Sequence, residues 1–176
     1  MDLHFRLPEL HDVEHARGEA LSLGIYADDR PPRGVAGLLD WRLCGRLSRL
    51  MQRDVFRGEL GECVLLPTDG RLAFEKLFLH GLGERAAFEL ETSEDVVDTM
   101  LRTLAHVGAR SSVLELPGRL KLARHEAMSQ LLRISDSYPE LDELTLVETA
   151  DAQRLLTGVV EGERRRARAL ATRLDD

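Results

Sequence analysis

Apolar and polar positions along this chain predict short buried strands separated by turns and helices. Between residues 76 and 83, the sequence KLFLHGLG places Leu77, Phe78 and Leu79 in an apolar run short enough for a strand buried on both faces. The glycines of Gly81-Leu82-Gly83 end this run, and a helical pattern follows. Strand, glycine turn and helix in this order are typical of a mostly parallel sheet, whose ligands gather outside the carboxyl ends of the strands.

Further segments have strand composition. The first alternates Leu3, Phe5 and Leu7 with polar residues and is ended by Pro8, which favours an edge strand. The link between the strands at 62–67 and 76–83 is short, so we expect these two to pair as an antiparallel hairpin. The remaining predicted strands are residues 19–26, 111–116 and 144–147.

Helical periodicity fills the intervals between the strands. Residues 35–53 carry apolar side chains at three- and four-residue spacing and predict one helix, with Trp41 packed against its neighbours. A second helix is expected to start at Ser93, whose hydroxyl would cap it, and to stop at Gly108. Two more helices are predicted over residues 120–134 and 151–176.

Together these elements predict a single α/β domain over residues 1–176. We expect a three-layer sandwich in which a mixed, mostly parallel sheet has helices on both faces. A chain of 176 residues is long enough to bury roughly 70% of its unfolded surface without disulfides or metal. The last part, residues 150–176, is expected to be an amphipathic, arginine-rich C-terminal helix.

Charge and composition exclude some classes of function. The net charge of -7 argues against general binding to nucleic acid or to an anionic membrane, because both need a basic surface. The sequence contains no apolar run of the ~20 residues that a membrane span needs, so we expect a cytoplasmic protein. Cys44 and Cys63 have no CxxC spacing and are predicted to be reduced thiols in the core. No cofactor is indicated.

One histidine-containing stretch and one acidic stretch resemble metal sites, but neither supplies enough ligands to hold a metal ion. His11 and His15 with Glu14 match the H-x-x-E-H pattern of some zinc peptidases, but the segment is short and no third ligand is marked, so a solvated turn is expected. Asp28 and Asp29 adjoin in a turn and supply too few convergent oxygens for Mg²⁺ or Ca²⁺. We therefore predict neither a metal ion nor catalytic residues.

Two other groups of residues are candidates for binding. The turn formed by Gly81, Leu82 and Gly83, with the helix start at Ser93, is a weak candidate loop for phosphate, and Glu84 beside it is unfavourable to an anion. Arginines on the helix at 35–53 are expected to form its solvated face. A partner surface is predicted on the C-terminal helix at Arg164, Arg165, Arg166, Arg168 and Arg173.

The order and spacing of several short motifs resemble the N-terminal domain of the leucyl aminopeptidase family over roughly residues 20 to 148. These motifs are Leu39-Asp40, the FRGELGE stretch from Phe56 to Glu62, and the apolar strand that ends in Gly81-Leu82-Gly83. The resemblance implies a fold similar to a macro domain. In that family the metal ions and catalytic residues belong to a separate C-terminal domain, whose NTDAEGRL stretch has no counterpart here. The family's N-terminal domain contributes to hexamer assembly and, in some bacterial members, to DNA contacts.

Three functions follow from these observations. The first is a free-standing, non-catalytic domain that acts by contact with another protein or with itself, and not with nucleic acid or membrane. The alternative is a macro-like binder of a nucleotide or ADP-ribose type ligand at the Gly81–Gly83 turn. The third is a metallohydrolase that uses the histidine pair, and the short segment and the missing third ligand argue against it.

Overall fold

The computed structural model describes residues 1–118 and 122–174, except for the side chains of residue 164 and residues 167–174. Its centre is a six-stranded sheet in the order β1-β6-β5-β2-β4-β3. Every neighbouring pair is parallel except β3 and β4, which are antiparallel as the short link between them predicted. The strands are β1 Asp2–Arg6, β2 Ala20–Ile25, β3 Cys63–Pro67, β4 Lys76–Gly81, β5 Ser111–Leu114 and β6 Glu143–Val147.

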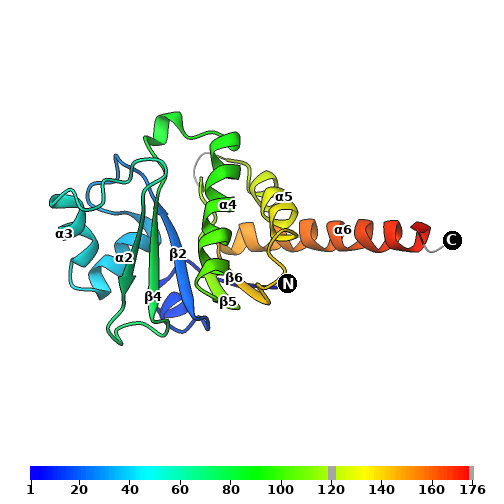
Figure 1. Ribbon diagram of the computed structural model, residues 1–176, viewed down its shortest axis with the longest axis horizontal. Coiled ribbons are helices and arrows are strands. Elements are labelled where there is room, and N and C mark those ends of the chain that lie inside the picture. Colours follow the sequence, from blue (N-terminus) through cyan, green and yellow to red (C-terminus); the bar gives the residue numbers. More distant parts are fainter. Residues whose placement is uncertain (119–121, 175–176) are drawn as a thin grey trace.

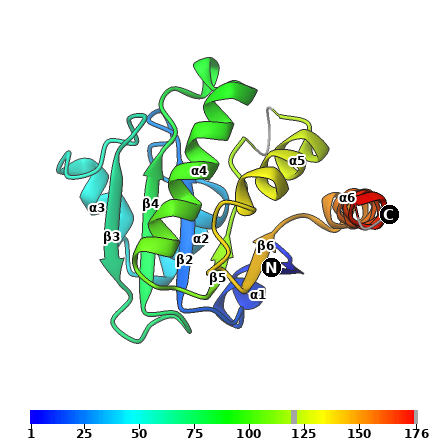
Figure 2. The same ribbon diagram turned by 45° about the vertical axis from the view of Figure 1, so that its right-hand side comes forward.

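Helices cover both faces of the sheet, which confirms the predicted α/β sandwich (Figures 1 and 2). One layer holds α1 Leu10–Glu14, α2 Gly34–Arg42 and α3 Arg46–Gln52. The other holds α4 Leu90–His106, α5 Arg124–Ser135 and the start of α6 Ala150–Leu174, and a 3₁₀ turn, η1 Arg85–Ala87, precedes α4. Each layer encloses its own apolar core against the sheet.

Successive side chains of β4 point to opposite faces of the sheet and so pack into the two cores in turn. Leu77 and Leu79 pack toward α2 and α3, whereas Phe78 packs toward α4. Because side chains alternate along a strand, His80 lies on the same face as Phe78. Five of the six residues of β4 are buried, as the continuous apolar run predicted.

The prediction of one helix over residues 35–53 is wrong, because the chain forms two. Cys44 and Gly45 have positive φ angles of 57° and 74°, which end α2 and allow α3 to start in a new direction. Asp40 stabilises this break by accepting hydrogen bonds from the amides of Leu47 and Ser48 at the start of α3.

Three side chains predicted to be buried are instead exposed. Trp41 is 73% exposed because it lies on the outer face of α2, so its predicted packing against a helix is wrong. Cys44 and Cys63 are both free thiols, but both are exposed, so the prediction that they lie in the core is also wrong. Cys63 is near the start of the sheet's antiparallel edge strand, where one face is only partly covered.

Two helix starts also differ from the sequence prediction. α4 begins at Leu90, with Glu89 in the N-cap position and no side-chain cap, so Ser93 lies one turn inside the helix and not at its cap. α5 begins at Arg124. The predicted start at Leu120 lies outside the described residues.

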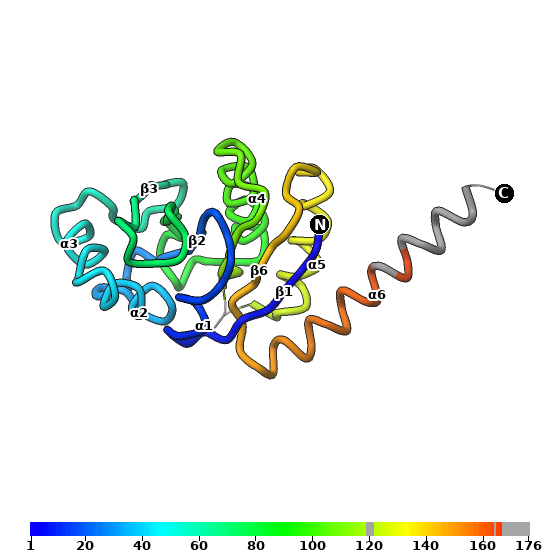
Figure 3. Tube along the Cα trace, turned by 90° about the horizontal axis from the view of Figure 1, so that it is seen from below, coloured from blue at the N-terminus to red at the C-terminus, as the bar shows by residue number. Residues whose placement is uncertain are grey.

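α6 leaves the body of the molecule after its first turns and extends well beyond it (Figures 1 and 3). Ala152, Leu156 and Val160 are buried and hold the start of the helix against the rest of the protein. No helix in the described part of the chain has the length and apolar character needed to cross a membrane.

Candidate functional site

The candidate site lies where the chain leaves neighbouring strands β2 and β5 toward opposite faces of the sheet. β2 leads into α2 on one face, whereas β5 leads toward α5 on the other. In open α/β sheets, ligands usually bind outside the carboxyl ends of the strands at such a point. We call this edge of the sheet, defined by Tyr26, Arg85, Arg124 and Glu148, the crevice.

Tyr26, the first residue after β2, is held at this edge by Arg85 from the segment after β4. The Arg85 guanidinium carbon lies 4.2 Å from the centroid of the Tyr26 ring, which is a cation–π contact. The same guanidinium donates to both carboxylate oxygens of Asp29, each at 2.7 Å. Asp28 accepts a hydrogen bond from the Arg85 amide. The two adjacent aspartates therefore tie the loop after β2 to the loop after β4.

A buried ion pair lies at the same edge of the sheet. Glu148 follows β6 directly, is completely buried, and accepts a hydrogen bond from Arg124 at the start of α5. Arg124 also donates to the carbonyl oxygens of Leu116 and Pro117, which follow β5. The Arg124 charge is therefore already neutralised by a carboxylate before any ligand arrives.

Three polar atoms at this edge have no hydrogen-bond partner among the described residues. They are the Tyr26 hydroxyl, Nε of Arg124 and Oε2 of Glu148. Burial raises the pKa of the Tyr26 hydroxyl, so it remains a neutral donor at neutral pH. Buried polar atoms without partners destabilise a fold, so these atoms fit a site where water or a polar ligand group completes the bonding.

The backbone amides of the predicted phosphate loop are already used inside the protein. The Gly81 amide donates to the Glu62 carbonyl, the Leu82 amide to the Ile25 carbonyl, and the Gly83 amide to the Gly58 carbonyl. Ser93, the other member of this predicted site, is buried within α4, and its amide donates to the carbonyl of Glu89. A phosphate at this turn would have to displace these bonds.

The histidine motif forms a short helix with a structural ion pair. The rings of His11 and His15 stack with their centroids 4.4 Å apart, and Glu14 pairs with Arg42 of α2. Val13 of the same helix is buried, so α1 is a packed element and not the solvated turn that was expected. Within the described residues, no group of three or more His, Cys, Asp or Glu side chains is arranged to hold a metal ion.

A profile of the N-terminal domain of the cytosol aminopeptidase family matches residues 23–135. The chain belongs to this family. The probable cytosol aminopeptidase of Alkaliphilus metalliredigens is 32% identical over 84 residues, which are 48% of this chain and 17% of that protein. The chain thus spans about a fifth of the length of the first curated relatives that it matches.

Solved structures agree with this assignment at the level of the fold. A tomato leucine aminopeptidase variant superposes with a TM-score of 0.63 and 17% identity, covering 90% of this chain and 35% of that one. A Trypanosoma brucei macrodomain in complex with ADP gives a TM-score of 0.69 and 16% identity, covering 90% of this chain and 67% of that one. The resemblance found in the sequence motifs is therefore confirmed, including the macro-like fold.

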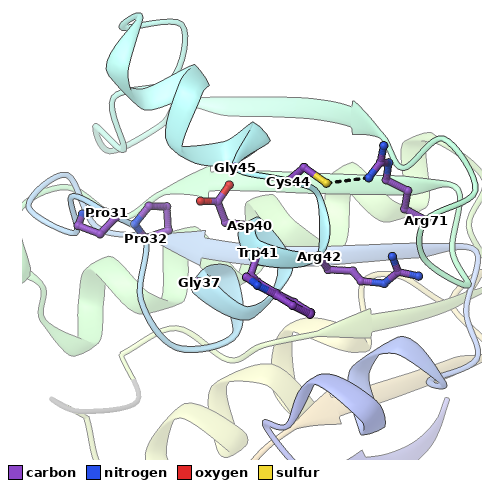
Figure 4. Close-up of a pocket in the computed structure, with 9 residues that line it drawn as sticks. All are labelled: Pro31, Pro32, Gly37, Asp40, Trp41, Arg42, Cys44, Gly45 and Arg71. Carbon is purple, nitrogen blue, oxygen red and sulfur yellow. Dashed lines mark hydrogen bonds between the residues drawn. The ribbon is translucent and has the colours of Figure 1, made fainter.

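The protein also has an open cavity of about 740 Å³ on its α2–α3 layer (Figure 4). The Trp41 ring borders it, and Arg71 reaches across to donate to the Cys44 sulfur at 2.9 Å. Asp40 also lines the cavity, but its carboxylate is used in capping α3. The remaining walls are Pro31, Pro32, Gly37, Arg42 and Gly45.

The predicted partner surface on α6 is described only in part. Arg165 and Arg166 are exposed, and Arg166 pairs with Glu163 on the same helix at 2.7 Å. The side chains of Arg164, Arg168 and Arg173 lie outside the described part of the structure. Their use in binding a partner stays a prediction.

Sequence reasoning missed the four side chains that build the crevice, namely Tyr26, Arg85, Arg124 and Glu148. Tyr26 and Glu148 directly follow strands, and this position was the available signal. Arg85 and Arg124 act through partners more than twenty positions away, at Asp29 and Glu148, and no local pattern marks such pairs.

Proposed function

We propose that this domain acts by contact with other proteins or with copies of itself, without catalysing a reaction. The observation that carries the proposal is α6, which is anchored at Ala152, Leu156 and Val160 and then extends away from the body (Figure 1). Leu155 is half exposed on the anchored part, and Arg165 and Arg166 are exposed further out. Arginine beside apolar side chains is a composition enriched at protein interfaces.

The family match supports the non-catalytic part of the proposal. The matched profile describes the N-terminal domain of cytosol aminopeptidases. Within the described residues, the charged groups at the crevice are engaged with each other in the pairs Asp29–Arg85 and Glu148–Arg124. Groups fixed in this way stabilise the fold and are poorly placed to transfer protons to a substrate.

Two variants test the use of α6. Removal of residues 162–176 leaves the buried anchors in place, so we expect an unchanged melting temperature together with loss of self-association or of cross-linked partners. Arg165→Glu with Arg166→Glu should act in the same direction, because it reverses the charge of the outer turns. Light scattering after gel filtration and cross-linking in cells provide the measurements.

A control variant with two charge reversals elsewhere tests whether the change in net charge alone affects association. Arg17→Glu with Arg53→Glu changes two exposed arginines away from α6 by the same amount and should leave association unchanged. Identical oligomeric state and partners for the truncated and full-length chains would reject the proposal.

A second candidate function is binding of a nucleotide or ADP-ribose type ligand at the crevice between β2 and β5. The unpartnered Tyr26 hydroxyl and Arg124 Nε favour it, and one of the macrodomains with this fold was solved in complex with ADP-ribose. The engaged amides of the Gly81–Gly83 turn count against the binding mode expected from the sequence.

Thermal shift with ADP-ribose separates this second function from the first. Ligand at 100 times its dissociation constant stabilises a fold by about 2.7 kcal/mol, which is a shift of several degrees. Tyr26→Phe should reduce that shift, whereas Tyr138→Phe, a tyrosine on the α5 side, should not. No shift in the unaltered protein would exclude the ligand.

A further inference from the structure

A second cavity, which we call the His80 cavity, lies under α4 and is lined by none of the crevice residues. It has a volume of about 330 Å³ and lies between residues 60–62, the end of β4 at His80 and Gly81, and the α4 residues Asp95, Val96 and Thr99. Small-molecule sites commonly begin near this volume, whereas a single water occupies only about 30 Å³ of liquid. The cavity is therefore large enough for a small organic molecule.

His80 forms the inner wall of this cavity and is only 2% exposed. Neither of its ring nitrogens has a hydrogen-bond partner among the described residues. Burial lowers the pKa of His80 to about 4, so the ring is neutral at neutral pH and offers one donor and one acceptor. A buried imidazole with two unmet bonds destabilises the protein, and a bound molecule that supplies them would remove this cost.

The charges around the His80 cavity select the kind of molecule. Its lining contains the two carboxylates of Glu62 and Asp95 and no lysine or arginine. Glu62 is occupied, because it accepts hydrogen bonds from the amides of Arg57, Gly58 and Glu59. Asp95 is exposed on the first half of α4 and remains the charged group at the mouth. An anionic ligand is disfavoured here, and a cation is favoured.

We propose that the His80 cavity binds a small organic ammonium compound, with Asp95 facing its charge and the His80 ring accepting one of its hydrogen bonds. Leu60 and Val96 provide apolar surface for the carbon skeleton. The ring nitrogens are shielded from solvent, so a ligand reaches them only when side chains of the cavity wall move. This site shares no residue with the crevice between β2 and β5.

Benzylamine and benzoate form a matched pair of probes, because they are similar in size and opposite in charge. In ¹H–¹⁵N spectra, benzylamine at millimolar concentration should shift the amide signals of residues 60–62, 80–81 and 95–99, whereas benzoate should not. Equal shifts with both compounds, or none with benzylamine, would overturn the proposal.

Separate variants test the role of Asp95 in facing the charge and the role of His80 in accepting a hydrogen bond. Asp95→Asn should weaken benzylamine about tenfold, corresponding to about 1.4 kcal/mol, whereas Glu91→Gln, an exposed change in the first turn of α4, should bind as the unaltered protein does. His80→Phe keeps an aromatic ring without nitrogens and should abolish binding. If His80→Phe does not fold, Asp95→Asn still tests the proposal, because an unchanged affinity of Asp95→Asn for benzylamine would contradict it.

Discussion

Arg85 lies over the ring of Tyr26 and at the same time holds the carboxylate of Asp29 through two hydrogen bonds. One side chain therefore joins the segment after β4 to two points of the loop after β2. Asp29 is 7% exposed, so its charge needs a partner, and Arg85 at 2.7 Å is closer to it than Arg33 at 3.8 Å. Arg85 and Asp29 are more than fifty positions apart in the sequence, and their contact holds the two loops together at the edge of the sheet.

Replacement of Arg85 should therefore destabilise the domain. Arg85→Ala leaves the Asp29 carboxylate nearly buried without its main partner, and we expect a loss of about 2 kcal/mol in urea unfolding. Arg154→Ala is the matched control, because Arg154 pairs with Asp151 on the exposed face of α6 and should cost less than about 0.5 kcal/mol. Equal losses in the two variants would contradict the structural role given to Arg85.

His80 should make stability depend on pH in the acid range. Burial lowers its pKa in the folded protein to about 4 from the usual 6.5. Between these values the unfolded chain binds a proton and the folded chain does not, so stability falls as pH falls from about 6.5 to about 4 and then stops changing. The loss attributable to His80 is on the order of 3 kcal/mol.

The comparison of the unaltered protein with His80→Phe isolates this effect. Denaturant unfolding at a series of pH values should show a shallower decline in the variant across that window. Carboxylates such as Glu62 contribute to both curves alike. Burial acts to raise the pKa of Glu62, but hydrogen bonds from backbone amides outweigh it and lower this pKa in both proteins. Parallel curves would show that His80 takes up its proton equally well in the folded state.

Asp40 should contribute to stability through the break between α2 and α3. Its carboxylate accepts from the Leu47 and Ser48 amides at 2.7 and 3.1 Å, so Asp40→Ala removes a helix cap and should cost about 1–2 kcal/mol. Asp40→Asn keeps one acceptor oxygen in place and should cost less than half as much. Thermal unfolding measures both, and a larger loss for the asparagine variant would argue against capping.

Two glycines should respond to alanine in opposite directions. A Cβ on Gly81 would lie 1.8 Å from the Glu59 carbonyl oxygen, so Gly81→Ala should destabilise by on the order of 4 kcal/mol or prevent folding. At Gly158 in α6, a Cβ would meet no described atom within 4 Å apart from its chain neighbours and the backbone of its own helix, and Gly158→Ala should stabilise this helix by up to about 1 kcal/mol. Circular dichroism during heating tests both, and a folded, unperturbed Gly81→Ala protein would refute the close approach.

Trp41 should report its exposure directly. Its fluorescence is expected to be red-shifted and strongly quenched by acrylamide, because the ring is largely in solvent. Trp41→Ala should change the free energy of unfolding by less than about 0.5 kcal/mol. A blue-shifted, protected signal would place the ring in an interface or in the core.

The sequence pattern predicted the strands well because burial on both faces of a parallel sheet requires continuous apolar runs such as Leu77 to Leu79. Helix boundaries were less predictable. The break at Cys44 depends on a left-handed residue that most sequence patterns do not mark, and the apolar spacing continues through it into Leu47. The crevice was not predictable, because Arg85 and Arg124 acquire their roles only when distant loops meet.

α6 has a geometric consequence of its own. From Val160, the last residue of its buried anchor, the helix continues to Leu174, and at 1.5 Å per residue this outer part is about 20 Å long. A continuous helix transmits direction as well as distance, because its backbone hydrogen bonds resist bending. A molecule bound to its outer turns would therefore be held at a set distance from the sheet and in a set orientation to it.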